Sequence, residues 1–150
     1  MRFAEFHQGQ LIECGPRLVD ADEIVAFARS WDPQWFHCDP SRAADGRWQG
    51  LIASGWHSCA IAMRLAYDGV LAGSESFGSP GLAYLRWPSP LRAGRTVLLR
   101  CTVIESRIAR SNPLLGILRW RWLLVDRAGD DEVLDTEVTS FFDLAPPAAP

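Results

Sequence analysis

The hydrophobic pattern of this chain is dominated by one long apolar segment, residues 50–67. Its few polar interruptions are Ser54, His57, Ser58 and Arg64. A segment with so little charge predicts a helix that is buried on most of its sides. The same interruptions argue against a membrane span, which needs about 20 predominantly apolar residues in a row. We therefore expect the chain to have no membrane partner.

The region before this segment carries the signals of a first helix. Asp20 can cap its N-terminus, with Glu23 at the third position as in a capping box. Pro33 predicts its end, because the residue before a proline avoids the helical conformation. Apolar residues follow at helical spacing: Ile24, Phe27, Ala28 and Trp31. We expect this helix to lie against another part of the fold.

Less regular segments surround these two helices. Residues 1–19 are predicted to be irregular or weakly extended, with glycine and proline as punctuation. Asp39-Pro40 predicts a short helix that reaches about residue 45, with the aspartate as cap and the proline in the first turn. Residues 69–81 are rich in glycine and serine and predict a mobile connection.

The last third of the chain has the alternating pattern of β-strands. Four extended segments are predicted, at residues 81–87, 96–106, 117–126 and 132–144. Ala128-Gly129-Asp130 predicts a hairpin between the last two. One long helix followed by consecutive strands indicates an α+β fold. Such a helix buries its faces only if the antiparallel sheet wraps around it.

Length and composition narrow the function classes. At 150 residues the chain is expected to form a single domain, residues 1–144, followed by a disordered tail rich in proline and alanine, residues 145–150. Its formal net charge of -3 argues against nucleic acid as a partner, because nucleic-acid-binding proteins carry basic patches.

The cysteines indicate no metal or redox chemistry. Cys14, Cys38, Cys59 and Cys101 are widely spaced and form no C-x-x-C pair. No secretory signal is present at the N-terminus, so reduced thiols in a cytoplasmic protein are expected. We predict no metal site and no cofactor.

The candidate chemistry lies just before the long helix. Asp32 and His37 are five residues apart with prolines nearby, so both side chains can turn into one cavity. A carboxylate and an imidazole can hold a water molecule between them and move its protons near neutral pH. The helix start at Ser54-Gly55 offers free backbone N–H groups to an oxygen that gains negative charge.

Two stretches carry a resemblance to a known family. Residues 32–39 (DPQWFHCD) and 50–57 (GLIASGWH) resemble the MaoC-like dehydratases, in the group of the (R)-specific enoyl-CoA hydratases. Gly78-Ser79-Pro80-Gly81 and the turn at residues 90–96 also resemble family elements, so the similarity covers most of residues 20–142. The resemblance implies the hot-dog fold, in which an antiparallel sheet wraps a central helix, and a homodimer with sheets joined edge to edge.

The resemblance also implies roles for individual residues. Asp32, His37 and Ala43 stand at positions of the family's hydratase motif. Asp32 and His37 would activate water for addition to a trans-2-enoyl thioester, with coenzyme A as part of the substrate, and the N–H of Gly55 would hold the thioester oxygen. Four residues would line the substrate site: Trp31, Trp35, Ser54 and His57.

This sequence departs from the family pattern at several of these positions. Trp31 stands where the family usually has Gly, Gln34-Trp35 where it has Asn-Pro, and Ser54 where it often has His. Structural roles remain open as alternatives: His37 as a core histidine, and His57 as a residue packed on a helix face.

Two other functions remain as rivals. One is a hot-dog thioesterase, which needs a carboxylate on the long helix, but no acidic residue precedes Asp68 there. The other is an acyl-thioester-binding module without activity. The altered Asn-Pro pair leaves this second possibility open.

Overall fold

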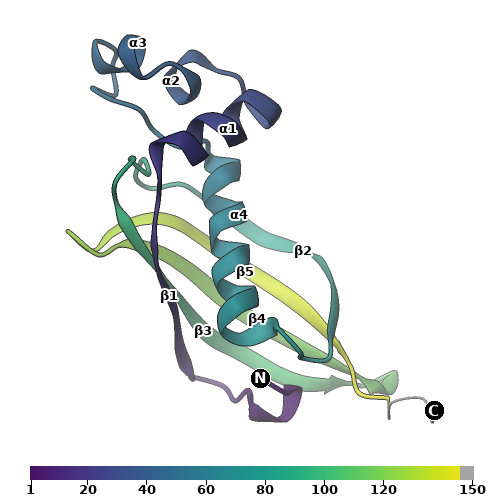
Figure 1. Cartoon of the computed structure of the whole chain (residues 1–150). Coiled ribbons are helices and arrows are strands. Elements are labelled where there is room, and N and C mark those ends of the chain that lie inside the picture. Colours follow the sequence, from purple (N-terminus) through teal and green to yellow (C-terminus); the bar gives the residue numbers. More distant parts are fainter. Residues whose placement is uncertain (146–150) are drawn as a thin grey trace.

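The computed structural model describes residues 1–145 as one curved sheet around a central helix, with three shorter helices gathered beyond one end of that helix (Figure 1). The helical elements are η1 (Phe3–Glu5), α1 (Ala21–Trp31), α2 (Trp35–Cys38), α3 (Pro40–Ala44), α4 (Gly55–Ala66) and η2 (Tyr67–Leu71). The strands are β1 (Leu11–Leu18), β2 (Ser76–Arg86), β3 (Thr96–Ala109), β4 (Asn112–Asp126) and β5 (Asp131–Asp143). This is the expected α+β hot-dog arrangement.

The sheet is antiparallel throughout, in the order β1-β3-β4-β5-β2. Alternate residues of the central strands face α4 and are buried, for example Leu99, which pairs with Leu124. Trp120 and Trp122 point to the same inner face and contact each other edge to face. The period-two pattern of these strands therefore places one apolar face of the sheet against the helix.

Helix α4 is shorter and less enclosed than the sequence pattern predicts. Ser54 caps it by accepting the Trp56 N–H at 3.2 Å, and residues 50–54 are not helical. Ile52 instead forms a bridge with Arg92, on a segment beside the sheet. One side of the helix packs on the sheet, but Met63 on another side is 46% exposed. The prediction of a helix buried on most sides is therefore wrong for this outer face.

The predicted caps of the smaller helices are confirmed. Asp20 accepts the Asp22 N–H at 2.6 Å at the start of α1, and Asp39 accepts the Arg42 N–H at 3.0 Å at the start of α3. Glu23 does not complete a capping box, because its carboxylate bonds Arg17 instead. The single-turn helix α2 was not predicted.

The two edges of the sheet compare differently with the predictions. Residues 11–18, expected to be irregular or weakly extended, are extended and form β1 along β3, with a register shift between Cys14 and Arg17 that interrupts the alternating pattern. Residues 76–81, expected in a mobile connection, instead begin β2, which pairs with β5, so the prediction is wrong for these residues. Both are edge strands, where glycine, proline and bulges are tolerated and obscure the strand signal. The predicted tail lies outside the described residues, except for Ala145.

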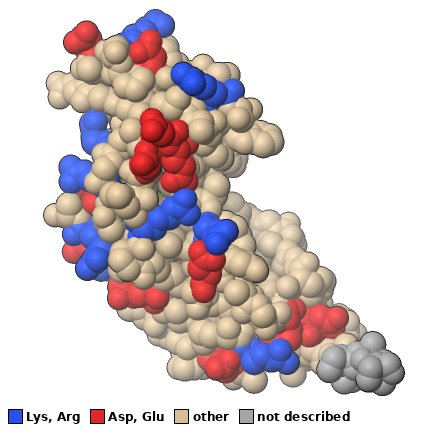
Figure 2. Space-filling model, viewed as in Figure 1, with Lys and Arg blue, Asp and Glu red and all other residues tan. Residues whose placement is uncertain are grey.

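Basic and acidic side chains are interspersed on the face of the molecule shown in Figure 2. In the described part of the chain, no helix is long and apolar enough to cross a membrane.

Candidate active site

Asp32 lies at the junction between α1 and the loop that follows it. Its N–H donates to the Ala28 carbonyl at 2.8 Å, so Asp32 is the C-terminal cap of α1. Its backbone has left the helical conformation, with φ of -153°, as expected for a residue that precedes a proline. The carboxylate is thereby held at a fixed point where the chain turns.

His37 lies in the short helix α2 and is buried. Its Nδ1 is 2.8 Å from the Ile52 carbonyl oxygen. Because a carbonyl can only accept, Nδ1 carries a proton and donates to it, which leaves Nε2 for other contacts. Nε2 lies 3.4 Å from Asp32 Oδ2. The two residues that the sequence analysis paired therefore face each other.

Two further side chains hold the Asp32 carboxylate. Ser54 Oγ donates to Oδ2 at 2.6 Å, and Gln34 Nε2 donates to Oδ1 at 2.8 Å. The hydrogen bond from Ser54 is the main reason that the pKa of Asp32 lies below its usual value, and Gln34 and the nearby His37 lower this pKa further. Asp32 is therefore ionised at neutral pH.

The start of α4 reaches the same place. Gly55 is the first residue of the helix, so its N–H has no acceptor within the helix. The positive end of the helix dipole also lies here. The Trp87 side chain covers Gly55 so closely that a Cβ on Gly55 would lie 2.6 Å from Trp87 Cε2. Only glycine fits at this position without displacing the indole.

These groups border a cavity of about 360 Å³. Its polar lining includes Asp32, His37, Ser54, Gly55, Ser58 and Ser89. Three tryptophans, all partly exposed, also line it: Trp48, Trp56 and Trp87. None of these three tryptophans was among the residues predicted from the sequence to line the substrate site. The signal for Trp87 was its place at the end of a strand, directly before the proline-rich turn of residues 88–90.

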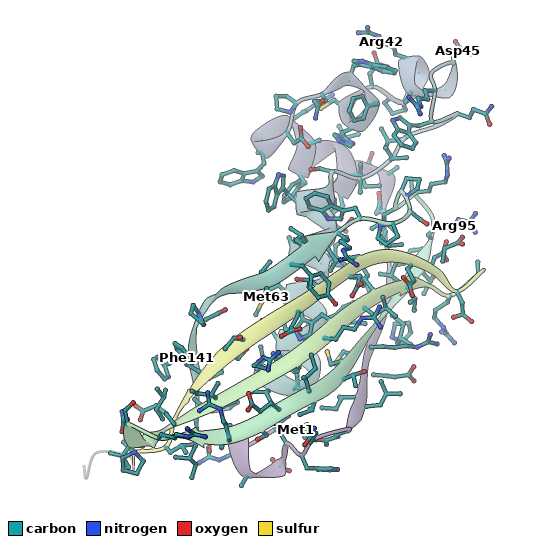
Figure 3. The ribbon with its side chains drawn as sticks, turned by 180° about the vertical axis from the view of Figure 1, so that it is seen from behind. Met1, Arg42, Asp45, Met63, Arg95 and Phe141 are labelled. Atoms are coloured by element: carbon teal, nitrogen blue, oxygen red, sulfur yellow. The ribbon has the colours of Figure 1, made fainter. Side chains whose placement is uncertain are left out.

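Three residues predicted for the substrate site lie elsewhere. Trp31 is 76% exposed at the end of α1. Trp35 packs on Gly46 and lies under the guanidinium of Arg42, in the helical end of the molecule where Figure 3 labels Arg42. None of these residues is among those that line the cavity of about 360 Å³.

His57 is the third of these residues. It lines a different cavity, because two positions along a helix turn a side chain about 200° from Gly55. The Ala43 side chain is buried in α3 and does not line the cavity of Asp32 and His37.

No three His, Cys, Asp or Glu side chains come together as a metal-binding group within residues 1–145. The four cysteines are free thiols. The chemistry that the cavity offers is acid–base: an ionised carboxylate, an imidazole whose Nε2 faces it, and a backbone N–H at a helix start.

Comparison with known proteins agrees with this architecture. Residues 4–114 match the model of the MaoC like domain. The crystal structure of a MaoC-like dehydratase from Rhodospirillum rubrum superposes with a TM-score of 0.85 at 29% identity, covering 95% of this chain and 97% of that one.

Two curated relatives are similar in sequence. The uncharacterized protein YdeM of Bacillus subtilis is 29% identical over 118 residues, which are 79% of this chain and 82% of YdeM. The 3-hydroxyacyl-thioester dehydratase Z of Mycobacterium tuberculosis is 30% identical over 101 residues, 66% of this chain but only 60% of that protein. The family match spans more than half of the chain. This protein therefore belongs to the MaoC-like dehydratase family.

Proposed function

We propose that the protein is a hydro-lyase of the (R)-specific enoyl-CoA hydratase type, which reversibly adds water to a trans-2-enoyl-CoA. The observation that carries this proposal is the meeting of Asp32, His37 and the first residue of α4 at one cavity. The activity in the name of dehydratase Z, on 3-hydroxyacyl thioesters, is the same reaction in the opposite direction.

In the proposed reaction, Asp32 and His37 hold a water molecule between them. His37 Nε2 takes a proton from this water while the oxygen of the water bonds to the β-carbon of the substrate. The electron pair of the double bond moves onto the thioester oxygen, and the Gly55 N–H stabilises the resulting enolate. The enolate then takes the proton from His37 at its α-carbon, so that one water has been added. Dehydration follows the same steps in reverse.

The hydrogen bonds of Asp32 support this assignment of roles. The bonds from Ser54 and Gln34 keep the carboxylate ionised and fix its direction. An ionised Asp32 favours a water that points a hydrogen toward it, and the bond from Nδ1 to Ile52 leaves Nε2 of His37 able to accept the other. Gln34, which stands where the family has asparagine, donates to this carboxylate.

The rival thioesterase reaction is less well supported. It needs a carboxylate on the central helix, and α4 from Gly55 to Ala66 contains no aspartate or glutamate. The coenzyme A thioester would be the only cofactor-like group in the proposed reaction.

We also propose that the protein forms a homodimer through β2 and the outer face of α4. β2 is an edge strand of eleven residues, most of them exposed. Met63 and Leu82 border an apolar groove of about 250 Å³ between α4 and β2, and each is nearly half exposed. A long exposed edge with apolar side chains is a surface that native proteins cover.

A direct assay tests the proposed function. Purified protein is mixed with crotonyl-CoA, and the absorbance of the conjugated thioester is followed together with the release of free thiol. A hydratase removes the conjugation without releasing thiol. Release of thiol would instead identify a thioesterase, and saturable binding of crotonyl-CoA without either change would identify a binding module.

A further inference from the structure

A second polar cluster lies on the opposite side of α4 from the candidate active site. Arg17 Nη2 of β1 lies 2.6 Å from Glu23 Oε1 of α1, and the same oxygen lies 3.2 Å from His57 Nε2 of α4. The cluster borders its own cavity of about 730 Å³. Three elements far apart in the sequence are thus joined by one carboxylate.

The imidazole of His57 is held tightly in this cluster. Its side chain is 3% exposed, and its ring stacks on Phe27 of α1 with centroids 4.5 Å apart and planes 10° from parallel. Burial lowers the pKa of His57, which favours the neutral ring. Since an ionised carboxylate can only accept, Nε2 carries the proton and donates a hydrogen bond to Glu23.

One nitrogen of this ring has no partner. His57 Nδ1 is buried and forms no hydrogen bond with any residue of the described chain. An unpaired buried polar atom lowers stability, and an apolar ring of the same shape would avoid that cost. The histidine therefore does something here that packing alone does not require, namely forming a directed bond to α1.

That bond acts on the helix that carries Asp32. α1 is joined to the first turn of α4 near both ends: Glu23 bonds His57, and Asp32 accepts from Ser54. Only Ile24 and Ala28 of α1 are fully buried, so apolar packing alone leaves the helix weakly held. We propose that His57 and Glu23 are positioning residues, which fix α1 on α4 so that Asp32 faces His37. This inference rests on the proposed hydratase function.

Other charged groups near the cluster do not make this connection. Arg64 and Asp68 border the same cavity and pair at 2.8 Å, but both are more than half exposed and lie on α4 and η2. Neither is paired with α1. Arg64→Met therefore serves as a matched control, since it removes a charge from the same cavity and leaves the connection between α1 and α4 intact.

The test uses His57→Phe in the full chain. Phenylalanine keeps the stack on Phe27, removes the unpaired nitrogen and leaves Arg17 and Glu23 paired with each other. We expect kcat for crotonyl-CoA hydration to fall about tenfold or more with KM within about twofold, because a small displacement of a catalytic group is costly. The melting temperature should stay unchanged or rise. Glu23→Ala should reproduce the loss of kcat, and Glu23→Gln, which still accepts from His57, should restore most of it.

Hydrogen exchange of the α1 amides provides a readout that needs no substrate. These amides, including that of Asp32, should exchange faster in His57→Phe and Glu23→Ala but not in Arg64→Met. Wild-type kcat in His57→Phe would overturn the inference, as would a loss of kcat that merely follows a lowered melting temperature. If the wild-type protein hydrates no enoyl thioester, the proposed function fails. In that case hydrogen exchange alone tests whether His57 and Glu23 hold α1 on α4. Unchanged exchange of the α1 amides in His57→Phe and Glu23→Ala would then overturn the inference.

Discussion

Asp32 is held by two side chains that stand where this sequence departs from the family pattern. Ser54 stands where the family often has His and donates to Oδ2 at 2.6 Å, while Gln34 replaces Asn and donates to Oδ1 at 2.8 Å. Each oxygen of the carboxylate therefore has one donor. At the scale of the residue, the departures at positions 34 and 54 leave the carboxylate oriented, because each of the two residues donates a hydrogen bond to it.

Ser54→Ala should raise the pKa of Asp32. The hydrogen bond from Ser54 is the largest influence that lowers the pKa of Asp32, so its loss lets this pKa rise. In the wild-type protein this pKa lies below its ordinary value of about 3.9. As the pH falls, NMR titration of the Asp32 carboxyl carbon should show protonation at a higher pH in Ser54→Ala than in the wild-type protein.

The control for this prediction is Ser89→Ala. Ser89 lines the same cavity, and no hydrogen bond joins it to Asp32 within residues 1–145. Its removal should leave the pKa of Asp32 where it is. A pKa of Asp32 that does not rise in Ser54→Ala would show that the serine has no part in setting the ionisation of Asp32.

At the scale of the element, the start of α4 depends on the absence of a side chain at Gly55. Gly55→Ala would place a methyl group about where Trp87 now lies, 2.6 Å from Cε2. Such overpacking costs about 1–3 kcal/mol of stability. Because Gly55 also borders the cavity, Gly55→Ala should lower the rate of hydration as well as the stability.

The double variant Gly55→Ala/Trp87→Leu tests whether the loss of stability comes from a direct clash between the new methyl group and the side chain at position 87. A smaller side chain at position 87 makes room for the methyl group, so denaturant unfolding should show a strong coupling between the two substitutions. Strictly additive effects on the free energy of unfolding would contradict a direct clash between the two residues.

The helices and strands also show which parts of the fold could be predicted from the sequence. Helices α1 and α3 were predictable because Asp20 and Asp39 cap them by local hydrogen bonds. The central strands were predictable because one of their faces is buried. Edge strands β1 and β2 were missed in part, since the register shift after Cys14 and the glycines of β2 conceal their pattern.

Only those parts of the candidate site that lie close together in the sequence could be predicted. Asp32 and His37 were found from their spacing and the resemblance, and they do meet. The predicted role of His57 in substrate binding depended on the direction of its side chain, which follows from the start of α4 at Gly55 rather than at Gly50. Trp48 comes to the cavity through tertiary contacts that no local pattern encodes, and the one local signal for Trp87 was its place before the proline-rich turn of residues 88–90.

At the scale of the whole molecule, the side formed by β2 and the outer face of α4 leaves apolar side chains and a strand edge exposed. The sheet ends at β2, and Figure 3 labels Met63 on α4 on this side of the molecule. The proposed homodimer would pair the β2 edges of two chains and cover both apolar grooves. An interface of this kind would join two sheets into one.

Leu82→Glu should disrupt this homodimer. Leu82 is 49% exposed, and a charge there would be buried without a partner in the proposed interface. Analytical ultracentrifugation should give about twice the chain mass of 16.7 kDa for the wild-type protein and the monomer mass for Leu82→Glu. Leu114→Glu, at a leucine that is 48% exposed but lies on β4, should remain a dimer. A monomeric wild-type protein would contradict the proposed assembly.

The central claim is that Asp32 and His37 together activate water for an enoyl thioester. The most direct measurement is the rate of crotonyl-CoA hydration by Asp32→Asn and His37→Ala, with circular dichroism to verify that each variant is folded. Each substitution should lower kcat/KM by about 100-fold or more, since each removes a group that contacts the reacting water. Hydration by both folded variants at close to the wild-type rate would contradict the claim.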